Sequence, residues 1–268
     1  MRPFIMMAMC TPGDEMTRNL RIAAVADIHL AKSSNRIFES LLSRVSEFSD
    51  VLLLCGDLTH HGLAEEAEIL AQELSRLRLH ILAVLGNHDH HSGQQEQIQR
   101  ILKNSGIQVL DGDTAVVEGV GFAGVKGFAT GFGQRVLEPW GETIIKQFVH
   151  EAVSEALKLE SGLARLSTPH RIAMLHYSPI RETVEGEPLE IYPFLGSSRL
   201  EEPLNRFNVT AAFHGHAHHG KLEGKTSLGV PVYNVSLPLM QSSMPADGPP
   251  FRVIEIPVET VPESQSTR

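Results

Sequence analysis

The chain has 268 residues, 42% of them hydrophobic, and a formal net charge of −9 at pH 7. This length and apolar content allow a substantial core. The negative charge disfavours a surface that neutralises nucleic-acid phosphates, so we do not expect a nucleic-acid partner. No apolar run approaches the roughly 20 residues that span a bilayer, so we expect no membrane association. The two cysteines, Cys10 and Cys55, are too few for a disulfide framework, which favours a reducing, cytoplasmic setting.

The two ends of the chain lack regular patterning. We expect a flexible extension over residues 1–19 and a flexible tail over 259–268. The apolar stretch before Cys10 is at the lower limit for a secretion signal, and Met9 is not the small residue that a cleavage site needs. No composition break marks a linker between the ends, so residues 20–258 are expected to form a single domain.

Regular patterning begins near Leu20. Three continuous apolar runs, "RIAAVAD" (21–27), "DVLLLCGD" (50–57) and "HILAVLGN" (80–87), are typical of strands that are covered on both faces. The segments between them, 36–48 and 64–78, carry apolar residues at helical spacing. The first half therefore predicts a β-α-β-α-β unit with a parallel sheet.

The second half has a different texture. Short β-type pieces with glycine punctuation follow residue 107, and an amphipathic helix is expected over about 141–160, with Gly162 as its stop. Further strands are expected at 170–176, 209–216, 229–236 and 251–257. The predicted fold class is α/β with a mostly β second half.

Five of the predicted strands end in histidine, aspartate or asparagine. Because ligands of parallel α/β sheets bind outside the carboxyl ends of the strands, these side chains are expected to converge. Residues two apart in extended chain point the same way, so Asp27 can act with His29, and His216 with His218. The seven candidate ligands are Asp27, His29, Asp57, Asn87, His176, His216 and His218. Without thiolates they suit Mn, Fe, Zn, Ni or Co, and seven is about right for two ions that share a carboxylate.

The ordered set D-x-H, G-D, G-N-H-D, H and G-H-x-H resembles the calcineurin-like metallophosphoesterase superfamily over roughly residues 21–219. The resemblance implies a two-sheet β-sandwich flanked by helices, with two divalent or mixed-valence transition metal ions at the strand ends. It implies that Asp27, His29 and His218 hold one ion, that Asn87, His176 and His216 hold the other, and that Asp57 bridges both. It further implies that Asn87 and His88 contact substrate, and that His88 is catalytic and oriented by Asp89.

The activity that the resemblance implies is hydrolysis of a small phosphodiester or phosphomonoester by a metal-activated hydroxide. "GDLTHHG" lacks the arginine that protein phosphatases of the superfamily carry at this turn. "GDLT" and "GNHD" are closer to small cyclic nucleotide phosphodiesterases, but "HYSP" stands where those enzymes usually have H-H-P. A cyclic nucleotide phosphodiesterase, a DNA nuclease and an inactive metal-free scaffold remain as alternatives, with the scaffold last.

Other polar residues near these motifs have simpler interpretations. His214 shares the strand parity of His216, and we expect it to support or pack against the ligands, whereas His219 should face solvent. Most of His60, His61, His90 and His91 are expected at the rim or in solvent, where any of them could touch substrate. The long segments 119–141 and 178–200 are candidates for shaping a substrate pocket.

Overall fold

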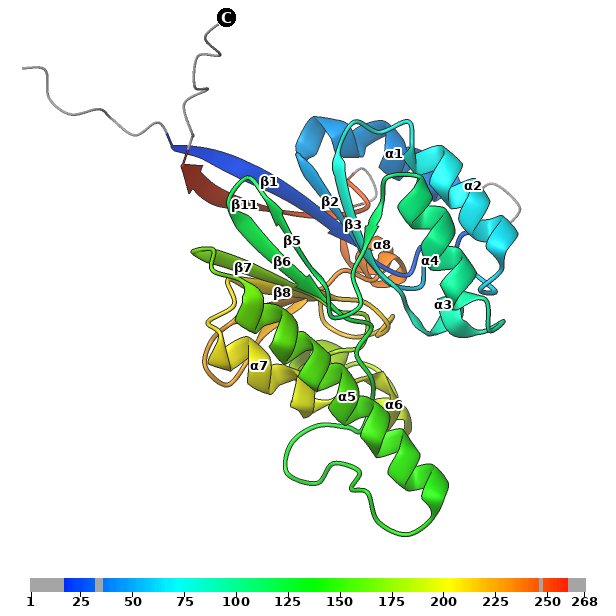
Figure 1. Ribbon diagram of the computed structural model, residues 1–268, viewed down its shortest axis with the longest axis vertical. Coiled ribbons are helices and arrows are strands. Elements are labelled where there is room, and N and C mark those ends of the chain that lie inside the picture. Colours follow the sequence, from blue (N-terminus) through cyan, green and yellow to red (C-terminus); the bar gives the residue numbers. More distant parts are fainter. Residues whose placement is uncertain (1–16, 32–35, 246–247, 260–268) are drawn as a thin grey trace, which may run out of the picture.

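The computed structural model describes residues 17–31, 36–245 and 248–259 and consists of two mixed sheets flanked by helices. Residues 1–16 of the predicted extension and the predicted tail from residue 260 lie outside these ranges. The predicted fold class is confirmed. Figure 1 shows α1, α2 and α4 beside the first sheet, and α5 and α7 against the second.

The first sheet has the strand order β11-β1-β2-β3-β4. Its strands are β1 (Thr17–Val25), β2 (Val51–Cys55), β3 (His80–Val84), β4 (Gln108–Val109) and β11 (Arg252–Glu259). The helices of this half are α1 (Arg36–Phe48), α2 (Ala64–Leu74), α3 (Asn87–His90) and α4 (Gln95–Asn104). Strands β1 to β4 are parallel, as the repeated crossovers predict, and β11 runs antiparallel at the edge.

The second sheet has the order β5-β6-β7-β8-β10-β9. Its strands are β5 (Thr114–Val117), β6 (Val120–Gly124), β7 (His170–Met174), β8 (Ala211–His214), β9 (Glu223–Lys225) and β10 (Pro231–Asn234). The second half of the chain contains the long helix α5 (Thr143–Arg165) and the short helices α7 (Glu201–Arg206) and α8 (Leu237–Ser243). Between β7 and α7 lie α6 (Tyr192–Leu195) and the 3₁₀ turns η1 (Glu182–Val184), η2 (Leu189–Ile191) and η3 (Ser198–Leu200).

Alternating side chains of the second sheet enter two different cores. Ile172 and Met174 of β7 lie in the core that both sheets share, whereas Ala173 between them joins Leu159 and Leu163 of α5 on the outer face. Successive side chains of a strand point to opposite faces of the sheet. These residues of β7 therefore pack in an apolar core on both faces. The two layers of packing hold the carboxyl ends of β1, β2, β7 and β8 in fixed relation.

Several boundaries differ from the sequence-based expectations. Strand β1 already begins at Thr17, which pairs with Glu259, so the described chain enters the sheet before the predicted end of the extension. Gly162 does not stop the long helix, which continues to Arg165. Gly162 is buried there, and a Cβ on it would lie 3.3 Å from the Ala123 Cβ, so the glycine serves close helix–sheet packing. The short helices α4, α7 and α8 were not predicted.

The core of the first sheet gives a test of this packing. Leu54 of the central strand β2 is fully buried, so Leu54→Ala is expected to lower the free energy of unfolding by about 2–5 kcal/mol. Val116 of the edge strand β5 is 60% exposed, and Val116→Ala should cost less than about 1 kcal/mol. Urea unfolding of both variants measures the difference, and equal losses would contradict the assignment of Leu54 to the core.

Candidate metal centre

Asp27, His29 and His218 form the first group of converging donors. One potential ligand atom from each lies within 4.8 Å of the others, and His218 Nε2 is 3.3 Å from Asp27 Oδ1. Burial by itself would raise the pKa of Asp27, but the hydrogen bond to His218 and the nearby histidines hold that pKa well below its usual range. Asp27 also accepts a hydrogen bond from the backbone N–H of His216 at 2.9 Å, which joins the end of β1 to the loop after β8.

The second group contains Asp57, His176 and His216, with Asn87 beside them. The Nε2 atom of His176 lies 2.9 Å from Asn87 Oδ1 and 3.3 Å from Asp57 Oδ1. The other carboxylate oxygen of Asp57, Oδ2, lies 3.9 Å from His29 Nε2. Asp57 therefore presents one carboxylate oxygen to each group.

The backbone at these residues is unusual. Among the described residues only six that are not glycine have a positive φ, and four of them are Asp27 (57°), His29 (46°), Asp57 (50°) and His216 (70°). Such conformations cost of order 1–3 kcal/mol each and persist where the surrounding structure enforces them. Their concentration at the converging side chains makes this edge of the sheets the candidate functional site.

Backbone carbonyls orient the two imidazole rings of the second group. His176 Nδ1 lies 3.1 Å from the Cys55 carbonyl, and His216 Nε2 lies 3.1 Å from the Phe194 carbonyl. A carbonyl only accepts, so each of these ring nitrogens donates and the opposite nitrogen keeps its lone pair. His176 thus presents Nε2, and His216 presents Nδ1, to the second group.

His88 is oriented in the same way, by a residue that the sequence did not suggest. Its Nδ1 donates to the His60 carbonyl at 2.7 Å, and its Nε2 lies 3.9 Å from Asp57 Oδ2. The expectation that Asp89 orients His88 directly is wrong. The buried Asp89 carboxylate instead accepts hydrogen bonds from the Gly86 N–H and from Leu58 and Thr59, so it fastens the turn after β3 to the turn after β2.

Two glycines let these turns approach each other. A Cβ on Gly56 would lie 2.4 Å from His176 Nδ1, and a Cβ on Gly86 would lie 2.2 Å from Asp57 Oδ1. Both distances are far inside van der Waals contact. Glycine at these positions is therefore a condition for bringing the ligand side chains together.

The electrostatics of the site favour a bound cation. Burial, together with the neighbouring charges of Asp27 and Asp89, raises the pKa of Asp57 to about 9, while burial lowers the pKa of His29 to about 4. Within the described part of the chain, His29 Nδ1 is buried and has no hydrogen-bond partner. Neutral imidazoles around two buried carboxylates are the donor set of a transition metal site, so these residues fit such ions.

The sequence matches the family model described as calcineurin-like phosphoesterase over residues 20–220. The chain belongs to the calcineurin-like phosphoesterase family. A curated relative of this phosphoesterase, described as a probable cyclic nucleotide phosphodiesterase of Vesicomyosocius okutanii subsp. Calyptogena okutanii (strain HA), is 25% identical over 219 residues. The match covers 75% of this chain and 79% of the relative.

Solved structures of low sequence identity share the fold of this phosphoesterase. The phosphopantetheinyl hydrolase of Mycobacterium tuberculosis is 14% identical, with a TM-score of 0.60 over 93% of this chain and 99% of the other. A protein of Thermus thermophilus, also 14% identical, has a TM-score of 0.51 over 81% of this chain and 89% of the other. None of the helices in the described ranges combines the length and apolar character that crossing a membrane requires.

The remaining histidines of the phosphoesterase divide into two kinds. His214 is fully buried, with Nε2 2.8 Å from Thr183 Oγ1, whereas His219 is exposed. His61, His90 and His91 are exposed, and His90 lines a separate small cavity with Lys126 and Glu151. His60 is also exposed, but its ring has a nitrogen within 4.8 Å of donor atoms of His29 and His88, so it belongs to the mouth of the site. The sequence places His60 in the turn after Asp57, but it does not show that the ring points toward His29 and His88.

Both long segments contact the second donor group, and the segment 119–141 does so through the Lys126 carbonyl, which accepts the N–H of His176 at 2.9 Å. The segment 178–200 reaches the second group through the Phe194 carbonyl. In the segment 119–141, Trp140 is 86% exposed, and Arg135 lines a separate cavity of about 370 Å³ with Arg181 and Tyr192. Both segments therefore contact the candidate centre, whereas Trp140 does not.

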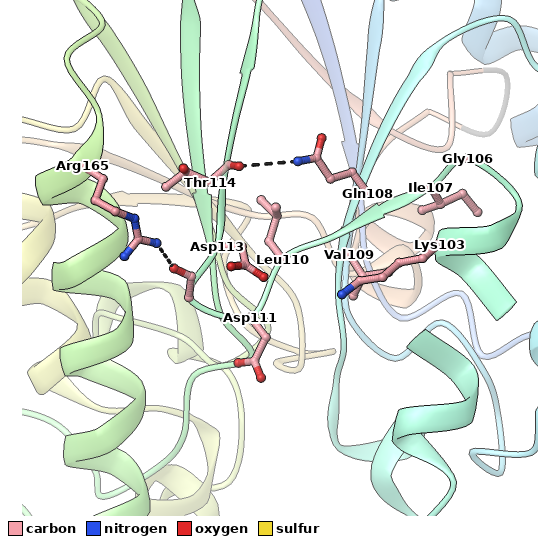
Figure 2. A pocket seen from close by; sticks show the side chains of 11 residues that line it. Lys103, Gly106, Ile107, Gln108, Val109, Leu110, Asp111, Asp113, Thr114 and Arg165 are labelled. Atoms are coloured by element: carbon pink, nitrogen blue, oxygen red, sulfur yellow. Dashed lines mark hydrogen bonds between the residues drawn. The ribbon is translucent and has the colours of Figure 1, made fainter. Parts of the chain in front are cut away.

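A larger cavity of the phosphoesterase, of about 740 Å³, lies between β4 and the end of α5 (Figure 2). Its charged lining residues are Lys103, Asp111, Asp113 and Arg165, and it shares no residue with the histidine and aspartate groups. Size alone therefore does not identify the chemical site.

Metal binding by the chain is expected to release protons. With a pKa of about 9, Asp57 is protonated at pH 7 in the metal-free chain, and it must lose that proton to bind an ion. Asp27 contributes none, because its pKa lies well below its usual range. Calorimetric titration with Mn²⁺ at pH 7, in buffers of different ionisation enthalpy, should show release of about one proton or more per chain. Binding without proton release would contradict the protonation state assigned to Asp57.

Proposed function

We propose that the protein is a dinuclear metal-dependent phosphoesterase that hydrolyses a small phosphodiester or phosphomonoester. The observation that carries the proposal is the position of Asp57, whose two oxygens face the two donor groups. In this assignment Asp27, His29 and His218 hold one ion, Asn87, His176 and His216 hold the other, and Asp57 bridges them. Two ions of this kind would supply Lewis acidity toward the phosphoryl oxygens and lower the pKa of a bound water.

His88 is the residue that we assign to proton transfer. The hydrogen bond from its Nδ1 to the His60 carbonyl fixes the ring, and the opposite nitrogen faces the space beside Asp57. Its side chain is 38% exposed, so a substrate can reach it. Held in this way, a protonated His88 can stabilise a phosphoryl oxygen and donate its Nε2 proton to the leaving alkoxide. Asn87, the residue before it, is the second substrate contact in this proposal.

The comparisons favour one narrower candidate. The curated relative at 25% identity carries the name of a cyclic nucleotide phosphodiesterase, and the match covers most of both chains. A cyclic nucleotide diester is therefore the second candidate substrate. The chain also shares its fold with a phosphopantetheinyl hydrolase, but 14% identity supports the fold alone.

Asp57→Asn tests the shared carboxylate. Because one side chain serves both ions in this proposal, the substitution is expected to weaken both and to lower turnover by more than about 100-fold. Metal content after dialysis and hydrolysis of bis-nitrophenyl phosphate measure the two effects. Asp113→Asn, at an exposed aspartate outside both donor groups, is the matched control. A variant that keeps two ions and a normal rate would refute the bridging role.

His88→Ala tests the proton donor. The variant should retain its metals, and its kcat should fall by about 10²–10⁴-fold for alkyl esters but much less for nitrophenyl esters, whose leaving groups need no proton. His80→Ala, at an exposed histidine at the opposite end of β3, is the control. Equal losses for both ester classes would exclude general-acid action by His88.

A further inference from the structure

A second cavity adjoins the first donor group. It has a volume of about 340 Å³, and its lining includes Asp27, His29 and His60 on one side and Leu237, Pro238 and Gln241 on the other. The last three residues belong to α8, which follows the segment matched by the family model, residues 20–220. This wall is therefore a feature of the chain that the family match does not cover.

Helix α8 is fastened to the strand that delivers Asp27. The N–H of Ala26 donates to the Val235 carbonyl at 2.8 Å, and the N–H of Leu237 donates to the Ala26 carbonyl at 3.0 Å. Leu237 is buried, as are Leu239 and Met240 in the next turn of the helix. The cavity wall thus has a fixed distance from the first donor group, which a specific binding site requires.

His60 is fixed on the opposite side of the cavity. Its N–H donates to the Leu30 carbonyl at 3.0 Å, and its own carbonyl accepts from His88 Nδ1 at 2.7 Å. Its ring lies edge-on to His29, with centroids 5.8 Å apart, and stays exposed. An exposed aromatic ring on a fixed backbone is a stacking surface for a planar group.

Gln241 supplies the hydrogen-bonding group of the cavity. Its side chain is exposed, and within the described part of the chain its amide makes no hydrogen bond. A glutamine amide offers one donor and one acceptor, the pair that matches the N6 and N7 atoms of adenine. The apolar Leu237 and Pro238 beside it fit the face of a base. A cavity of this size lies in the range of small-molecule sites.

We propose that this cavity binds the adenine base of a nucleotide substrate, with Gln241 pairing with the base edge and His60 stacking on its face. The inference rests on the proposed phosphoesterase function, since the base site would position a phosphoryl group at the neighbouring donor groups. It assigns base selectivity to residues after position 220, on helix α8.

The first test measures base binding without metal or catalysis. Metal-free protein is titrated with adenosine and, separately, with inosine, which lacks the N6 amino group, and binding is followed by ligand-observed NMR. Adenosine should bind about tenfold more tightly than inosine, and Gln241→Ala should remove the difference. Gln72→Ala, at an exposed glutamine of α2, is the control and should leave it unchanged. Equal binding of the two nucleosides by the unaltered chain would overturn the proposal.

The second test separates this proposal from the phosphoesterase function. With Mn²⁺ bound, Gln241→Ala should raise KM about tenfold for adenine nucleotide esters and leave kcat/KM for methyl nitrophenyl phosphate unchanged. Hydrolysis with no preference for adenine, or a preference for alkyl esters, would overturn the base site and leave the phosphoesterase intact. Selective adenosine binding without hydrolysis of any ester would support the base site and refute the phosphoesterase.

Discussion

The burial of two carboxylates beside each other is the constraint on which the rest of the site depends. Asp27 and Asp57 are both almost completely buried, and no lysine or arginine in the described ranges forms an ion pair with either. Burying a charge without a counter-charge is costly. Burial lowers the pKa values of His29 and His176, whereas the hydrogen bond to Asp27 raises the pKa of His218. A bound cation would stabilise both Asp27 and Asp57 as carboxylates.

The fold provides that arrangement from both of its sheets. The ends of β1 and β2 deliver Asp27 and Asp57, while the loops after β7 and β8 deliver His176 and His216 from the second sheet. Contacts between the sheets fix their relation: Asp27 accepts from the His216 N–H, and His176 Nδ1 lies against the Cys55 carbonyl. The left-handed backbone at four site residues is the local strain that these contacts sustain.

Much of this could be predicted from the sequence, because the relevant information is periodic or local. Continuous apolar runs gave the parallel strands, and polar residues at their ends gave the seven candidate ligands, which the structure brings into two adjoining groups with Asp57 between them. Membership of the family followed from the same motifs. The unpredicted features depend on tertiary contacts: at Gly162, where the sequence predicts a stop, the helix continues and packs closely against Ala123 of β6.

The hydrogen-bond partners of the ligands were also beyond the sequence. Asp89 stands next to His88 in the chain, yet its carboxylate turns toward residues 58, 59 and 86, and the orientation of His88 comes from the His60 carbonyl. Backbone carbonyls such as those of Cys55 and Phe194 carry no sequence signature, because every residue has one. The position of helix α8 beside the first donor group was also not predicted, because it depends on where β10 lies in the second sheet.

The most direct test of the shared carboxylate is the magnetic coupling between two bound ions. Electron paramagnetic resonance of the full chain, loaded with two equivalents of Mn²⁺, should show an exchange-coupled pair, because ions bridged by Asp57 would lie within about 4 Å of each other. Spectra of isolated Mn²⁺ at two equivalents, or saturation by a single ion, would contradict a dinuclear centre built around Asp57.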